Sequence, residues 1–417
     1  MPRTKVPAVS GRKIDDVLGT PSVAKKIEGA GTSKTALRKQ LVSELAEDGL
    51  APQSFQFLTS TQQAGFIQRA LNKLPANKQA TAKAAAGKHA KQIGIDRSAK
   101  VYSKVEAKHV DKIETIVEGA KGPAKEVYQA YEHDISLIDG AYAKGAHFSP
   151  TDVGVNLNAA KTYADKKRPS MYTWFHEFGH NIDYISTGME DYLTKWRATH
   201  DTHAMYASTK YKGGLFGKTL RKEAEDTIKA RQAAIKADLF DKVDRLDMAA
   251  LDELHANYKL GDDAYTKARH AKRHLDRLNS AASPEEFEAV WGMTAKEVQE
   301  EVKAAKKAVK QDARFKRQYN IQHARKAVED DLRKLSDAER CDVSDIFEGA
   351  TKGGVQAGWG HGKGYWKDPT NLPIEAFAEF FSASIANPDS MRVLEQYFPK
   401  SRAVFDDILA AIQGGQI

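Results

Sequence analysis

The sequence has almost no cysteine and no long apolar run. Its one cysteine, Cys341, excludes an internal disulfide and a metal cluster held by several thiolates of one chain. Any metal must therefore be bound by histidine and carboxylate side chains. No run of about 18 apolar residues occurs, and the basic start MPRTKVPAVSGRK leads into no apolar segment, so we expect neither a membrane span nor a secretory signal.

Charged residues are abundant instead. They form 29% of the 417 residues, against 41% hydrophobic and 9% aromatic, a balance that favours a soluble, helix-rich protein with two or three domains. Residues 1–110 contain 19 Lys and Arg against 8 Asp and Glu, whereas the whole chain carries only +8. This basic quarter is suited to nucleic acid or an acidic protein surface, although a solvated basic face is an equal alternative.

Shifts in composition divide the chain into segments of different character. Pro, Gly, Ser and Lys dominate the first segment, and short helical patterns fill the second. The third segment mixes helical and strand patterns. A long block of charged helical patterns and a final segment rich in Gly and aromatic residues follow. We expect a flexible basic arm (1–32) and a helical basic adaptor or docking region (33–97). The first half of an α+β domain (98–189), a charged helical insertion (190–339) and the second half of that domain (340–417) follow.

Caps, Gly and Pro predict where the helices of the first half lie. Ser/Thr caps and closing Gly or Pro residues bound several candidates, and Gly122-Pro123 separates the last two. The predicted helices are 32–49, 60–75, 77–94, 98–120 and 124–133.

Two β-branched runs then predict a small sheet. DISLIDG (134–140) and VGVNLN (153–158) read as strands, separated by the loop AYAKGAHFSPTD. A helix over 169–188 follows directly, which makes a compact α+β unit.

The later helices are of two kinds. Charged amphipathic patterns fill most of 190–335, with a capping box from Thr294 to Glu297 and a helix start at Ser283-Pro284. The last segment carries the helix IEAFAEFFSASIANP and two amphipathic helices after it. The fold class expected is therefore α+β and predominantly α-helical.

The string HEFGH carries metal-site chemistry. His176 and His180 are four residues apart, so a helix presents both rings on one face to a single cation. Glu177 lies beside that cation, where it can take a proton from a bound water and pass it to a leaving amine. Zinc in catalytic sites usually has three protein ligands, so one more is required.

Four residues are candidates for the missing ligand: Asp183, His361, Glu375 and Glu379. Asp183 lies too far along the helix to reach the metal and is better suited to support a ligating histidine. Glu375 and Glu379 are four apart on the otherwise apolar helix EAFAEFF, where two unpaired buried charges would be costly. One ligand and one supporting carboxylate explain them, although a solvent-facing pair is the alternative.

These two motifs resemble those of a known group of peptidases. HEFGHNIDY followed by EAFAEFF is similar to the gluzincin metallopeptidases of the anthrax-lethal-factor type, which combine HExxH with a downstream E-x-x-x-E-x-F helix. Together with SDIFEGATKGG and GWGHGKGYW, they also resemble the zincin-like domain of tailed-phage minor head proteins and phage-borne toxins. The resemblance covers roughly 123–190 and 340–415.

The resemblance implies a role for each residue. Glu375 is then the third zinc ligand and Glu379 its supporting carboxylate. Tyr365, or alternatively His361, stabilises the oxyanion of the tetrahedral intermediate. The run VGVNLN becomes the edge strand along which an extended substrate pairs.

The expected function is a zinc-dependent endopeptidase, phage-encoded and virion-associated. Its partners would be a protein or peptide substrate, phage capsid or portal proteins, and nucleic acid or an acidic protein at the basic region, with no membrane. It would act in the virion or the host cytoplasm. The alternatives are a structural minor head protein that keeps the fold without proteolysis, and a secreted peptidase effector.

Overall fold

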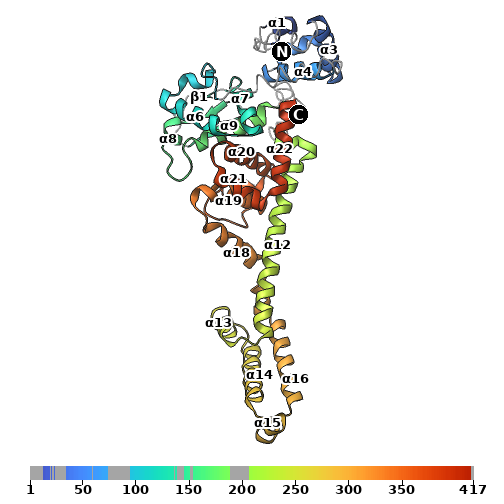
Figure 1. Cartoon of the computed structure of the whole chain (residues 1–417), viewed down its shortest axis with the longest axis vertical. Helices are drawn as coiled ribbons and strands as arrows, with labels where there is room; N and C mark the ends of the chain where they lie inside the picture. The colour runs from blue at the N-terminus through green and yellow to red at the C-terminus, as the bar shows by residue number, and fades with distance from the viewer. Residues whose placement is uncertain are drawn as a thin grey trace, which may run out of the picture. The chain divides into compact units, whose positions relative to one another are not determined.

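The computed structural model describes residues 13–18, 20, 23, 34–58, 60–73, 94–135, 137–138, 145–150, 154–187 and 206–414. Across these residues it is 74% helix, in 20 helices, with one small three-stranded mixed sheet (Figure 1), which confirms the expected helical majority. No helix in the described part combines the length and apolar character needed to cross a membrane. Of the predicted helix 77–94, only Gly94 lies among the described residues. The predicted flexible arm 1–32 is described at 13–18, 20 and 23, and there the prediction is wrong, because Ile14–Leu18 form a helix whose Ile14, Val17 and Leu18 are buried in a core.

The chain forms two compact units. The first contains Met1–Glu223 and Leu335–Ile417, and the second is Ala224–Lys334. The second unit begins and ends inside the segment 190–339, which the sequence sets apart as a helical block. All residues singled out for metal chemistry belong to the first unit.

The first helices of the chain bury a small core of their own. Leu37, Leu41 and Leu45 recur every four residues and are fully buried with Phe55 and Ile67. Both longer helices fall inside the predicted ranges 32–49 and 60–75. The elements are α1 (Ile14–Leu18), α3 (Lys34–Glu47), η1 (Pro52–Phe57) and α4 (Ser60–Asn72).

The predicted continuous helix over 98–120 is wrong. The chain forms η2 (Lys100–Lys104), passes through extended residues, and only then forms α6 (Ala107–Gly119), followed by α7 (Pro123–Tyr131). Tyr102 explains the break, since its hydroxyl bonds that of Tyr128 at 3.0 Å and donates to Glu132 at 3.1 Å. Tertiary contacts of this one side chain override the local helical preference.

The sheet has three strands, one more than predicted. They are β1 (Leu137–Ile138), β2 (His147–Ser149) and β3 (Gly154–Asn156), in the order β1-β3-β2, with β1 parallel and β2 antiparallel to β3. The strand β2 lies in the predicted loop, where Phe148 packs its ring on Tyr184, 5.3 Å away. The expectation that VGVNLN is an edge strand is wrong, because β3 is central.

The helix that carries HEFGH is α9 (Tyr172–Ile185), and it is buried over most of its length. A helix buried on nearly all sides needs apolar residues all round, which its Trp and Phe residues provide. It stops at Ser186, just before the predicted end at residue 188. Shorter elements flank it: α8 (Ala159–Tyr163), α11 (Ala207–Lys210) and η4 (Tyr211–Gly213).

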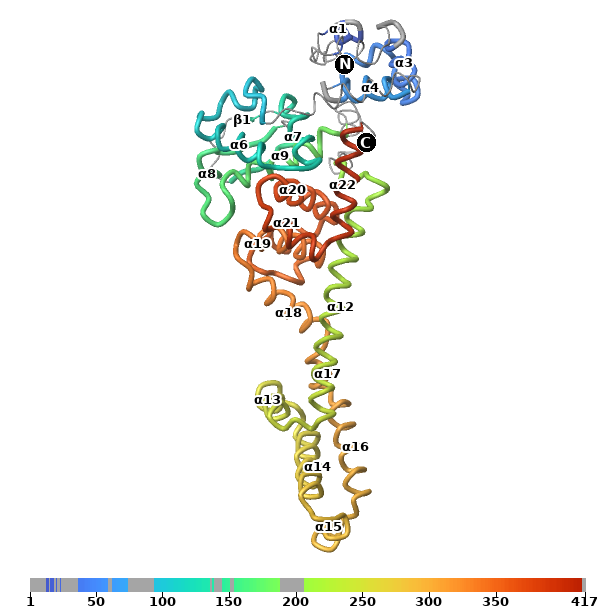
Figure 2. The backbone as a smooth tube through the Cα atoms, viewed as in Figure 1, coloured from blue at the N-terminus to red at the C-terminus, as the bar shows by residue number. Residues whose placement is uncertain are grey.

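The second unit is entirely helical in its secondary structure. Its α14 and α16 lie side by side, as Figure 2 shows, and bury Ala268, Ala271, Val298 and Val302 in a separate core. The predicted capping box and the predicted helix start at residue 284 are both confirmed. The elements are α12 (Leu215–Asp244, which begins in the first unit), α13 (Met248–Tyr258), α14 (Asp262–Ser280), α15 (Pro284–Trp291), α16 (Ala295–Gln311), α17 (Ala313–Arg317) and α18 (Ile321–Arg333).

The last elements return to the first unit. Leu372, Phe377, Phe380 and Phe381 of the helix EAFAEFF are buried, as its apolar composition predicts. The three helices expected after residue 370 are all present. The elements are α19 (Asp337–Ala350), η5 (Tyr365–Lys367), α20 (Asn371–Ala386), α21 (Pro388–Tyr397) and α22 (Pro399–Gly414).

The helices α9 and α20 lie side by side (Figure 1) and come into backbone contact at Gly179. A Cβ at this position would lie 2.9 Å from Ala378 Cα and 3.2 Å from Phe381 Cβ. Two helices approach this closely only where small residues meet. The glycine of HEFGH therefore brings the second motif, EAFAE, next to the first.

Candidate metal centre

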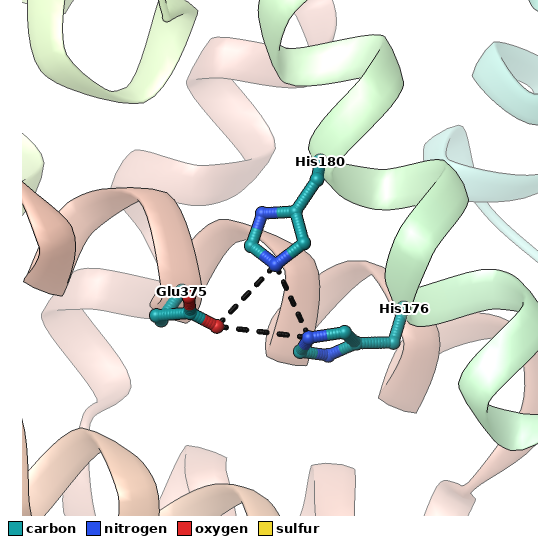
Figure 3. Close-up of side chains that lie close together, drawn as sticks. All are labelled: His176, His180 and Glu375. Atoms are coloured by element: carbon teal, nitrogen blue, oxygen red, sulfur yellow. Dashed lines mark hydrogen bonds and ion pairs between the residues drawn. The ribbon is translucent and has the colours of Figure 1, made fainter. Parts of the chain in front are cut away.

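Three side chains from α9 and α20 point at one another (Figure 3). The Nε2 atoms of His176 and His180 are 3.2 Å apart, and Glu375 Oε2 lies 3.6 Å from the first and 3.3 Å from the second. Tetrahedral zinc, with bonds of about 2.0–2.1 Å, separates its ligand atoms by about 3.3–3.4 Å. The three donor atoms therefore already have the spacing that one cation requires.

Burial reinforces this geometry. Glu375 is 4% exposed, and its Oε2 is buried without a hydrogen-bond partner among the described residues. This oxygen faces the two imidazoles, and a buried carboxylate needs positive charge beside it, which protonated histidine or a bound cation can supply. The group formed by His176, His180 and Glu375 could hold a metal ion, and its nitrogen and oxygen donors suit zinc.

Protonation of this group is tightly coupled in the metal-free protein. Burial favours neutral Glu375, but the imidazoles of His180 and His176 outweigh it and hold the pKa of Glu375 well below its usual value. Burial also disfavours charged His176, but Glu379 and Glu375 raise the pKa of this histidine well above 6.5. A metal ion has to displace the proton from His176, so metal binding should weaken as the pH falls.

Glu177 lies on the same helix, next to the three donors. It is 6% exposed, and burial raises its pKa above the ordinary value of 4.5, against the opposing charges of His176 and His180. A carboxylate with a raised pKa is a better proton acceptor than an exposed one. His147 of β2 also acts on its pKa, which places the edge strand close to Glu177.

Glu379 contacts the ring of His176, a candidate metal ligand. Its Oε2 lies 3.5 Å from Nδ1 of His176, the ring nitrogen that faces away from Glu375. Burial acts to raise the pKa of Glu379, but His176 and the hydrogen bonds around it lower this pKa to about 2. A charged carboxylate at Nδ1 fixes the ring and keeps Nε2 available as a donor to metal.

A second buried acid, Asp342, shares the hydroxyl of Tyr172 with Glu379, and it was not predicted from the sequence. The Tyr172 hydroxyl lies 2.7 Å from Glu379 Oε2 and 2.5 Å from Asp342 Oδ1, while Ser390 donates to Asp342 Oδ2 at 2.5 Å. Burial and the charge of Glu379 raise the pKa of Asp342 well above 3.8. The proton retained on Asp342 lets this carboxyl share one hydrogen-bond cluster with Tyr172 and the charged Glu379, where two adjacent carboxylates would repel each other.

The acids of α19 did leave a signal in the sequence. Asp342, Asp345 and Glu348 follow one another at intervals of three, which places them near one face of a helix, and all three are buried. Glu348 accepts from Gln356 Nε2 and from Gly362 N, and a Cβ on Gly360 would collide with its Oε2. This face of α19 thus organises both the support of Glu379 and the Gly-rich loop before η5.

Asp183 was expected to support a ligating histidine. The charge of His180 acts on its carboxylate, but its hydrogen bonds go to the start of α11. Its carboxylate accepts from Ser208 N at 2.7 Å and from Ser208 Oγ at 2.5 Å, at the start of α11. Burial raises the pKa of Asp183 to about 7, in spite of these two bonds. The main structural role of Asp183 is to hold α11 against α9.

Tyr365 and His361 both reach Glu375 from the Gly-rich loop. The Tyr365 hydroxyl donates to Glu375 Oε1, while His361 Nε2 lies 3.9 Å from the same oxygen. The two rings stack with centroids 4.3 Å apart. Burial acts to lower the pKa of His361, but Asp345, 3.1 Å from its Nδ1, and Glu375 raise it to about 9. Either side chain can present a proton beside the metal group.

No protein-family model, no curated protein and no solved structure matches this chain. Function has to be inferred from these side chains themselves. Their arrangement comprises a three-donor cation group, a buried carboxylate base beside it, and two proton donors that reach Glu375.

Proposed function

We propose that the protein is a zinc-dependent endopeptidase. The observation that carries the proposal is the triangle of His176, His180 and Glu375, whose donor atoms already have tetrahedral spacing. Glu177 beside this triangle adds a base, and a buried base next to a three-ligand zinc group is the arrangement of water-activating hydrolases. The α+β helix-and-sheet unit around it would then be a zincin-like domain.

Zinc bound there would polarise the scissile carbonyl and acidify a water. Glu177 accepts the proton of the attacking water and delivers it to the leaving amine nitrogen as the C–N bond breaks. Its raised pKa suits both halves of this transfer, because the proton must be taken up and then released. Glu379 keeps the His176 ring oriented throughout.

The charge that develops on the carbonyl oxygen needs donors. Tyr365 and His361 are the residues in reach, and each would stabilise the oxyanion by a hydrogen bond once substrate displaces the contact with Glu375. The Asp345 carboxylate holds the His361 ring through Nδ1, which leaves Nε2 to face the reaction.

An extended peptide would bind along β2. Among the described residues this strand lies at one edge of the sheet, and it packs against α9, so a chain paired to β2 would pass the helix that carries the proposed base. The proposed partner strand of the substrate is therefore His147–Ser149 rather than VGVNLN.

The biological setting stays a proposal drawn from the resemblance of the motifs. A virion-associated phage protein that acts on capsid or portal proteins is the setting we favour, in the virion or the host cytoplasm. A minor head protein that keeps the domain as structure, and a secreted peptidase effector, are the alternatives. The basic residues 1–110 would supply contacts to nucleic acid or an acidic protein in any of these settings.

Metal content and cleavage test this function together. Purified protein should contain one tightly bound zinc by elemental analysis, and Glu375→Ala should lose it. Glu177→Gln should keep the zinc but cleave a mixed peptide library at least about 100-fold more slowly by mass spectrometry. Glu288→Gln, on an exposed face of α15, is the matched control and should behave as wild type. A metal-free wild type, or full cleavage by Glu177→Gln, would refute the proposal.

A further inference from the structure

The two oxygens of Glu375 face different partners. Oε2 points at His176 and His180, whereas Oε1 contacts the Tyr365 hydroxyl and lies 3.9 Å from His361 Nε2. A carboxylate placed in this way can bind one cation on each side. Carboxylates that bridge two metal ions are common in hydrolytic sites, where the ions lie about 3.5–4 Å apart.

A second set of donors lies on the Oε1 side. Asp345, His361 and Glu375 each offer one ligand atom, and these atoms lie within 4.8 Å of one another. The spread is wider than in the first group, so a cation here has to draw the side chains inward. His361 is 41% exposed in its side chain and lies on a Gly-rich loop, so a small shift of this loop, with the loss of the present ring stacking on Tyr365, would bring its ring inward.

Asp345 provides independent support for a ligand at this place. It is only 3% exposed, and although Oδ1 is paired with His361 Nδ1, Oδ2 is buried with no hydrogen-bond partner among the residues described. Leaving a buried carboxylate oxygen unsatisfied is costly. A bound cation would satisfy it, as one would satisfy Glu375 Oε2.

We propose that Asp345, His361 and Glu375 form a second, weaker site for a divalent cation, which shares Glu375 with the first. One imidazole and two carboxylates suit zinc or manganese better than a purely oxygen-seeking ion. The wider donor spacing makes this site fill only after the first group is occupied.

Occupation of the second site has a consequence for catalysis, which rests on the proposed peptidase function. A cation bound to His361 and Glu375 would take the ring nitrogen and crowd the Tyr365 hydroxyl, the two groups available to stabilise the oxyanion. Excess zinc should therefore inhibit cleavage, and this inhibition should be lost in Asp345→Asn even if that variant is slower at low zinc.

Zinc titration of the full-length, metal-free protein tests the site without reference to activity. By calorimetry and elemental analysis, wild type should bind two zinc ions per chain in two separate steps. Asp345→Asn and His361→Gln should each bind one, with the first step kept. His274→Ala, which removes an equally close histidine–carboxylate pair from the second unit, should still bind two.

The outcomes separate the two proposals. A wild type that binds a single zinc overturns the second site and leaves the first intact, whereas a wild type that binds none overturns the proposed function. Two ions retained in both Asp345→Asn and His361→Gln would show adventitious binding and refute the inference. If Asp345→Asn fails to fold by circular dichroism, His361→Gln decides, and loss of both steps in folded His361→Gln also counts against a separate site.

Discussion

Asp183 illustrates how one buried carboxyl can depend on pH without touching the metal. Burial lifts its pKa to about 7, although hydrogen bonds from Ser208 and the Ala207 backbone and the charge of His180 all favour the ionised form. The folded protein therefore holds a proton on Asp183 that the unfolded chain releases near pH 4. Where the folded state binds more protons, stability falls as the pH rises.

The pH dependence of stability should thus differ between wild type and Asp183→Asn. From about pH 4 to pH 7, the wild-type free energy of unfolding should fall relative to the variant by roughly 1.4 kcal/mol per pH unit, and the difference should level off above pH 7. Urea unfolding of metal-free protein at several pH values measures this. A constant difference across the range would mean that Asp183 is charged in the folded state throughout.

At the scale of the element, the metal group depends on how closely α9 and α20 approach. Gly179 is the point of contact, and any side chain there meets the backbone of α20 before it meets anything flexible. Because the two helices carry all three donors, a small separation between them moves Glu375 away from both histidines at once.

Gly179→Ala should therefore weaken both folding and metal binding. We expect a loss of about 1–3 kcal/mol in the free energy of unfolding, as for overpacked cores, and a clear loss of zinc affinity. Gly119→Ala is the matched control, since a Cβ at Gly119 in α6 meets no atom within 4 Å. That variant should be neutral or slightly stabilised and bind zinc normally. Equal effects in both variants would argue against the backbone contact.

The same two helices mark how far sequence reasoning reaches. The metal-binding roles of HEFGH and EAFAE were predictable because each motif places ligand-type side chains four residues apart on a helix. The apolar residues around both motifs indicated that these helices are buried. The contact between the motifs was not predictable from spacing, since the second unit intervenes in the chain. Asp342 and Asp345 were overlooked because a charged residue in a helix is usually solvated. The strand β2 was overlooked because its three residues leave too short a pattern to recognise.

At the scale of the molecule, the two compact units have separate cores, and only the first contains the metal group. Each should unfold as its own transition in calorimetry. Zinc at 1,000 times its Kd should raise the free energy of unfolding of the first unit by about 4 kcal/mol. Leu251→Ala should lower the free energy of unfolding of the second unit alone, by about 2–5 kcal/mol, because Leu251 is fully buried in the core of that unit. A single transition moved by both changes would show one cooperative whole.

The long separation of the two motifs in the chain also determines when the metal group can form during synthesis of the protein. Tyr172 and Glu379, which meet in one hydrogen bond, are 207 residues apart in the chain. At ribosomal rates of about 5–20 residues per second, roughly 10–40 s pass between synthesis of the first motif and synthesis of the second. During that interval HEFGH exists without its third ligand. The nascent chain therefore cannot assemble the complete metal group, or any hydrolysis that depends on it, until nearly all of its folding partners have been made.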